Sequence, residues 1–235
     1  KVNLDFNKEF INTFSEKIEN GNIEFINQTL KDLHEADVAN LIENLNPNTR
    51  IKLIELESFN INPEIFIELN ESIQGEVLQL LSINSIIKII KRLESDNAIK
   101  ILENLEKDTK DKVLEKLPPK DKFLLEEGLS YPEDSAARIM QREFTAVPSN
   151  WTVGQTIDYL REDKDLPEEF LEIFIVDNDF KPIGTVPSSR VLRTSRDLKM
   201  NSIMIEMPVL ISANMDQEEV GHTFENYNLV SAGVV

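Results

Sequence analysis

Apolar residues recur with a period of twelve along the first half of the chain. Leucine occupies one position of nearly every period, with Leu56 adjacent to the one that lacks it. Apolar residues also precede this position by four and, in most periods, by three residues, and such spacing places them on one face of a helix. The periodic leucines are Leu33, Leu45, Leu69, Leu81, Leu93, Leu105, Leu117 and Leu129.

Short polar breaks separate these periods. Examples are Asn46-Pro47, Asn60 to Pro63, Ser82 to Ser85, Ser95-Asp96-Asn97 and Pro118-Pro119. Asn, Ser and Asp cap the free N–H groups of a following helix, and proline cannot continue the preceding one. Helices this short are marginal alone, but stacked on their neighbours they bury a continuous core. The pattern therefore predicts a helical solenoid from about residue 5 to residue 127, and not a coiled coil, because heptads are absent.

The pattern changes after Gly128. A short helix is expected through 136–140, a strand at 144–148, and a helix over 153–161 capped by Thr152. Two further strands are expected at 173–176 and 182–186, after which the pattern restarts with a strand at 208–211 and a helix opened by Asp216. We therefore predict a mixed fold, an all-α solenoid of twelve-residue repeats followed by α/β modules, the second one incomplete.

The amino-acid composition limits the classes of partner that the chain can bind. The chain carries 43 acidic and 25 basic residues, a formal net charge of −18. A polyanion repels phosphate, so nucleic acid and anionic membrane surfaces are disfavoured and cations are favoured, although acidity also simply keeps a chain soluble. Cysteine is absent, which excludes disulfides and thiolate metal sites. The two histidines, His34 and His222, are too far apart in sequence to suggest a zinc site.

No segment approaches the roughly 20 apolar residues that span a bilayer. The chain starts at Lys1 without a signal-like apolar region, so we expect a cytosolic fragment with no direct membrane insertion. No nucleophile with a positioned base, phosphate loop or metalloprotease motif is present, so we predict that it is not an enzyme. His34 at the start of HEAD is expected to cap or pack a helix.

Two segments of the second half resemble CBS modules. They are RIMQREFTAVPSNWTVGQTIDYL with FIVDNDFKPIGTV, and SIM with PVLISANMDQEEVGHTFENYNLVSAGVV. With LSYPEDSAARIM before them and HEADVANLIENL further upstream, the chain resembles the cytosolic region of MgtE-family magnesium transporters. The resemblance divides the chain into a helical N domain (1–128), a linker (129–139), a first CBS module (140–200) and a partial second module (201–235).

The resemblance implies a regulatory role. In this family Mg²⁺ ions bridge acidic faces and hold a CBS-mediated homodimer compact, which closes a transmembrane pore that this fragment lacks. Carried over by position, the implied metal ligands are Asp96, Asp216 and Glu218. Each also has a structural reading, since Asp96 and Asp216 are credible helix caps and Glu218 favours a helix N-terminus.

The chain departs from the family pattern at several positions. Lys100 stands one helical turn after Asp96 where the family has an acidic ligand, and Asn228 replaces another on the second module. Fewer ions or a weaker response are therefore expected. Pro187 and Arg190 occupy the places where nucleotide-binding CBS modules hold phosphate and ribose, so no high-affinity nucleotide is expected at this half-site.

Three functional hypotheses follow. The first is a Mg²⁺-sensing regulatory region of a magnesium transporter, on the cytoplasmic side of the cell membrane. The second is a CBS-containing scaffold whose solenoid binds a protein partner and whose carboxylates are solvated surface. The third is an adenine-nucleotide sensor, which Pro187 and Arg190 disfavour.

Overall fold

The computed structural model describes residues 6–56, 62–167, 169–207 and 209–235. The chain divides into two compact units, Lys1–Leu125 and Glu126–Val235. The boundary falls within one helix, α10 (Pro119–Ser130). The predicted break at Asn60 lies outside the described residues.

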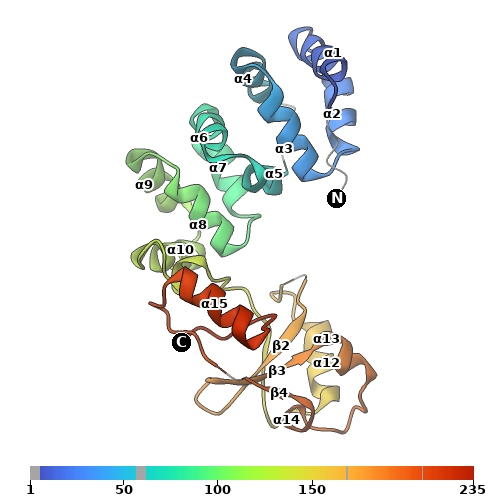
Figure 1. Ribbon diagram of the computed structural model, residues 1–235, viewed down its shortest axis with the longest axis vertical. Helices are drawn as coiled ribbons and strands as arrows, with labels where there is room; N and C mark the ends of the chain where they lie inside the picture. Colours follow the sequence, from blue (N-terminus) through green and yellow to red (C-terminus); the bar gives the residue numbers. More distant parts are fainter. Residues whose placement is uncertain (1–5, 57–61, 168, 208) are drawn as a thin grey trace. The chain divides into compact units, whose positions relative to one another are not determined.

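Short helices make up the first unit, following one another along the chain (Figure 1). Before α10 they are α1 (Lys8–Glu19), α2 (Ile23–Lys31), α3 (Glu35–Asn44), α4 (Pro47–Glu55), α5 (Pro63–Glu68), α6 (Glu71–Leu80), α7 (Ile83–Ile90), α8 (Ser95–Glu103) and α9 (Lys107–Lys116).

The twelve-residue period marks where these helices end. Leu45 and Leu117 follow α3 and α9 in extended conformation, and each donates its N–H to the carbonyl three residues earlier. From Leu41 onward, an apolar residue stands four positions before each periodic position and contributes to the core. These residues are all buried: Leu41, Leu53, Ile65, Val77, Ile89, Ile101, Val113 and Leu125. A helix of two or three turns thus turns one apolar face inward and then stops.

Side-chain caps begin most of the helices. Asn46 Oδ1 accepts from Thr49 N at 3.0 Å, and Ser82 Oγ accepts from Ser85 N at 3.1 Å, which confirms two predicted caps. Asn62 Oδ1 accepts from Glu64 N at a longer 3.4 Å. The N-cap of α8 is Glu94, so Ser95 and Asp96 lie inside the first turn of that helix. Asp96 is therefore not the N-cap of α8.

Polar side chains tie one repeat to the next. Lys52 Nζ lies 2.8 Å from Glu19 Oε2, and this hydrogen bond lowers the pKa of Glu19. The buried guanidinium of Arg50 donates through Nε to Glu76 Oε1 at 3.2 Å. These contacts join α1 to α4 and α4 to α6, and they add directional bonds to the apolar stacking.

A four-stranded sheet organises the second unit, in the order β1-β2-β3-β4. β1 pairs parallel with β2, while β2 with β3 and β3 with β4 pair antiparallel. The strands are β1 (Ala146–Pro148), β2 (Glu172–Val176), β3 (Pro182–Pro187) and β4 (Ile205–Glu206). The helices are α11 (Ala136–Ile139), α12 (Val153–Glu162), α13 (Ser188–Arg193), α14 (Met200–Ile203) and α15 (Gln217–Tyr227).

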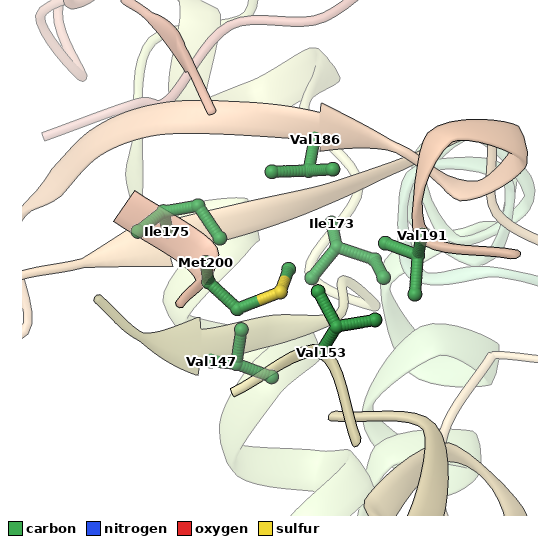
Figure 2. Packing of buried hydrophobic residues seen from close by; sticks show 7 residues of the cluster. All are labelled: Val147, Val153, Ile173, Ile175, Val186, Val191 and Met200. Atoms are coloured by element: carbon green, nitrogen blue, oxygen red, sulfur yellow. The ribbon is translucent and has the colours of Figure 1, made fainter. Parts of the chain in front are cut away.

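The core of this unit lies between the sheet and the helices α12, α13 and α14. Its side chains come from three strands and all three helices and converge in Figure 2. They are Val147, Val153, Ile173, Ile175, Val186, Val191 and Met200, and none is more than 1% exposed. Alternate residues of β2 point to this side, as expected for a half-buried strand.

A second, shorter version of the β–α–β arrangement follows. Ile211 and Val234, which precede and follow α15 in the sequence, form a parallel bridge. β1 and β2 are likewise paired in parallel and have α12 between them in the sequence. Of the predicted strand at 208–211, Ile211 forms this bridge, and Pro208 lies outside the described residues. The predicted fold class, an all-α helical region followed by an α/β region with a small mixed sheet, is confirmed.

Candidate functional site

Two of the three predicted metal ligands share the first turn of α15. Asp216 is the N-cap of this helix, and its Oδ1 accepts from the Glu218 N–H at 2.8 Å. The side chains of both residues are exposed. The sequence places them here because Asp is a strong N-cap and acidic residues are stabilised by the partial positive charge of a helix N-terminus.

That same positive end competes with a bound cation. Each carboxylate at the N-terminus of α15 is already stabilised by the helix dipole, and Asp216 also by a backbone donor. A cation bound here therefore needs further oxygen ligands besides the carboxylates of Asp216 and Glu218. Mg²⁺ accepts such partial sites, because it commonly keeps several of its waters.

A third carboxylate, which the sequence pattern did not single out, lies beside this turn. Asp134 accepts from the Gln217 N–H through its main-chain oxygen at 2.7 Å, and from Gln217 Nε2 through Oδ1 at 2.9 Å. Its place in the YPED segment was the sequence feature that could have drawn attention to Asp134. The contact with Gln217 could not be predicted, because the two residues are far apart in the sequence. Across the described residues, no three Asp, Glu or His side chains gather closely enough to hold a metal ion by themselves.

Asp96, the remaining predicted ligand, belongs to the first unit. It is half-buried in the first turn of α8, and its Oδ1 accepts from Asn97 N at 2.8 Å. Lys100 is exposed one turn later. The structure thus brings Asp216 and Glu218 together on α15, while Asp96 is described within a separate unit.

The predicted departures have local structural roles. Asn228 ends α15 in the left-handed conformation, with φ 50° and ψ 47°, which asparagine tolerates better than most residues. Arg190 Nη1 donates to the main-chain oxygen of Ile203 at 2.9 Å. Ser188 Oγ, at the start of α13, donates to Phe170 O at 3.0 Å and to Leu171 O at 2.9 Å. Arg190, one of the two residues at the half-site where no high-affinity nucleotide is expected, and its neighbour Ser188 thus both donate to backbone oxygens.

The histidines have no metal-binding geometry in the described residues. His34 is the N-cap of α3, and its Nδ1 accepts from Ala36 N at 3.3 Å, which confirms the predicted capping role. His222 is exposed on α15. Among the described residues, none of the helices combines the length and apolar character needed to cross a membrane.

The fold and the acidic turn define a class of protein, namely a helical-repeat domain joined to an α/β module that carries surface carboxylates. Residues 33–134 match the family model of the MgtE intracellular N domain, and residues 136–197 match that of the CBS domain. The chain therefore contains an MgtE intracellular N domain followed by a CBS domain.

Curated relatives agree with this assignment. The chain is 24% identical over 110 residues to a magnesium transporter MgtE of Enterococcus faecalis, which covers 47% of this chain and 24% of the relative. It is 26% identical over 117 residues to the MgtE of Thermus thermophilus, covering 50% of this chain and 26% of the relative. The matched part thus spans about a quarter of the length of these relatives.

Solved structures share the fold. A crystal structure of the soluble part of a magnesium transporter superposes with a TM-score of 0.79 at 20% identity, covering 97% of this chain and 90% of the other. The cytosolic domain of the Mg²⁺ channel MgtE in complex with ATP superposes with a TM-score of 0.83 at 22% identity, covering 96% and 92%. At this identity the likeness establishes the fold.

Proposed function

We propose that this chain is the Mg²⁺-sensing regulatory region of a magnesium transporter, located on the cytoplasmic side of the membrane and without catalytic activity. The observation that carries the proposal is the order of two domains in one chain, an MgtE intracellular N domain followed directly by a CBS domain. The names of the curated relatives, all magnesium transporters, support it.

Electrostatic repulsion supplies the mechanism. A chain with a net charge of −18 repels itself and a second copy, so a compact state needs cations to screen or bridge its carboxylates. In this proposal Asp216 and Glu218 on α15, and Asp96 on α8, hold Mg²⁺ through carboxylate oxygens and retained waters. The ion shifts the population only as far as it binds the compact state more tightly than the open one.

The compact state then acts on the rest of the transporter. We further propose a homodimer contact in the CBS modules. A transmembrane pore elsewhere in the full-length protein is proposed because the relatives are magnesium transporters. If one state of the pore requires the compact sensor, an ion that stabilises the compact sensor also stabilises that state of the pore. Lys100 lowers the expected affinity at Asp96, because an ammonium group one turn away opposes a cation.

A titration of Mg²⁺ into this chain tests the proposal. Scattering follows the radius of gyration and thermal unfolding follows the melting temperature, both at constant ionic strength. We expect compaction and stabilisation at millimolar Mg²⁺. Asp216→Asn should weaken the apparent affinity roughly tenfold, because it removes a charged ligand. Asparagine is as good an N-cap as aspartate, so this substitution separates metal binding from helix capping.

Glu225→Gln is the matched control, because it removes one charge from the exposed last turn of the same helix. It should leave the Mg²⁺ response unchanged. Equal responses in both variants would point to general screening and contradict a site at Asp216. A parallel ATP titration distinguishes the nucleotide sensor, since stabilisation by ATP alone would favour that hypothesis. Absence of both responses would favour the protein-binding scaffold.

A further inference from the structure

The segment that leads from α10 into the first CBS module is hydrogen-bonded to the start of the second module. Ala136 N donates to Met215 O at 2.7 Å and Ala137 N donates to Ala213 O at 2.9 Å. Gln217 N completes the set by donating to Asp134 O at 2.7 Å. The residues that carry the candidate ion site are therefore bonded on one side to residues 134–137.

A buried arginine ties the same segment to the end of α10. Arg138 is 8% exposed, and its Nη1 donates to Gly128 O and to Tyr131 O, each at 3.1 Å. Gly128 lies in the last turn of α10 and Tyr131 directly follows that helix, so the buried guanidinium fixes the end of α10 to the segment that follows.

A second arginine repeats the arrangement. Arg142 Nε lies 2.9 Å from Glu127 Oε2, and its side chain is 6% exposed. Its Nη2 donates to Ala137 O at 2.9 Å. Glu127 lies in the last turn of α10, so the ion pair joins that helix to Arg142. Arg142 in turn bonds Ala137, the residue whose amide donates to Ala213 O. Glu127 is 35% exposed, so the buried member of this pair is the guanidinium of Arg142.

We propose that residues 131–142 form a clamp that couples the last turn of α10 to the first turn of α15. Arg138 and Arg142 hold α10, while the amides of Ala136 and Ala137 and the main-chain oxygen of Asp134 hold the start of the second module. Asp134 and Arg138 are then positioning residues for the ion site, acting through Gln217 and the 213–217 segment. The clamp stands on contacts within the second unit, and its role in ion sensing rests on the proposed function.

Amide hydrogen exchange of the whole chain tests the clamp without metal. In Arg138→Met, we expect protection to fall roughly tenfold at Ala136, Ala137 and Gln217 as well as at residues 126–131. Arg196→Met is the matched control, because Arg196 also donates to a backbone oxygen, Gly154 O, and to the carboxylate of Asp158. Its effect should be confined to the first turn of α12.

Two outcomes decide the clamp. Faster exchange in Arg138→Met that is confined to 126–131 would overturn the coupling, whereas spread to Gln217 supports it. If Arg138→Met does not fold, Gln217→Ala serves instead, because it removes an exposed side-chain contact to Asp134 and should still raise exchange at Ala136.

The same exchange measurement with added Mg²⁺ distinguishes failure of the clamp from failure of the proposed function. In the wild-type chain, Mg²⁺ should slow exchange at 217–220 and also at 126–131, and Arg138→Met should abolish the second effect. Slowing at 217–220 alone in the wild-type chain would overturn the clamp and leave ion sensing intact. If Mg²⁺ changes neither region, the sensing proposal fails, and the metal-free comparison still decides the clamp.

Discussion

Phe180 occupies a backbone conformation that an aromatic residue rarely adopts. Its φ is +62°, in the turn between β2 and β3, and its side chain is 66% exposed. The turn is held by Asp177 Oδ1, which accepts from Asp179 N at 3.0 Å and Lys181 N at 2.9 Å. The side chain therefore buries little, while its Cβ carries the steric cost of the left-handed region.

Phe180→Gly is accordingly expected to stabilise the second unit. Relief of the left-handed strain exceeds the added chain entropy of glycine by a net of roughly 0.5–1 kcal/mol. Chemical denaturation followed by the fluorescence of Trp151, the single tryptophan of the chain, measures this change. Asn228→Gly is the comparison, because asparagine tolerates its φ of 50° and should gain much less. A loss of stability in Phe180→Gly would mean that the phenyl ring makes contacts that outweigh the strain.

Helix starts show how unevenly the elements of the solenoid are capped. Asn46 and Ser82 accept from the backbone of their helices, whereas Glu94 and Glu106, the N-caps of α8 and α9, make no side-chain cap bond. Glutamate is one methylene longer than the residues that reach the N2 or N3 amide from this position. The backbone of Glu106 is nevertheless extended, with φ −58° and ψ 145°, as an N-cap requires.

Glu106→Asp should therefore stabilise the first unit. The shorter carboxylate can accept from an amide of the first turn, a gain of about 0.5–1 kcal/mol, and the net charge is unchanged. Urea denaturation followed by far-ultraviolet circular dichroism gives the free energy of unfolding. Thr152→Ala, which removes the capping box of α12, is expected to cost a similar amount in the second unit. No gain in Glu106→Asp would show that solvent already satisfies these amides equally well.

Elements governed by local chemistry could be predicted from the sequence. The twelve-residue period located the buried residues of the solenoid, because two to three helical turns and one break fit that length. Thr152 and Asp216 were predicted to start their helices and do so. The N-cap of α8 was misplaced because Ser95, Asp96 and Asn97 are all good caps, and the chain uses Glu94 instead.

Contacts that join distant parts of the sequence could not be predicted in this way. Asp134 meets Gln217, and Ala137 meets Ala213, through main-chain atoms that carry no sequence signature. No sequence pattern singled out Arg138 or Arg142, whose buried side chains donate to backbone oxygens. The surroundings of the candidate site therefore became visible only in the structure, although Asp216 and Glu218 themselves had been assigned by resemblance.

Charge is the property that acts on the whole molecule. With 43 acidic against 25 basic residues, not every carboxylate can pair with a cation, and the ion pairs Lys52 with Glu19 and Arg196 with Asp158 are exposed. Exposed pairs contribute little to the stability of the fold, because solvent and salt screen them. Repulsion among the carboxylates should therefore dominate the response of the chain to salt.

We expect the melting temperature of this chain to rise as NaCl increases from about 10 mM to about 150 mM. The Debye length falls from about 30 Å to about 8 Å over this range, which screens repulsion between distant carboxylates while leaving buried contacts nearly unchanged. Thermal unfolding followed by circular dichroism at each salt concentration measures the effect. Glu225→Gln, which removes one negative charge, should show a shallower rise, and a flat or falling melting temperature would contradict self-repulsion. Because any salt provides this screening, only the part of a Mg²⁺ response that remains at constant ionic strength can be assigned to ions held by Asp216 and Glu218.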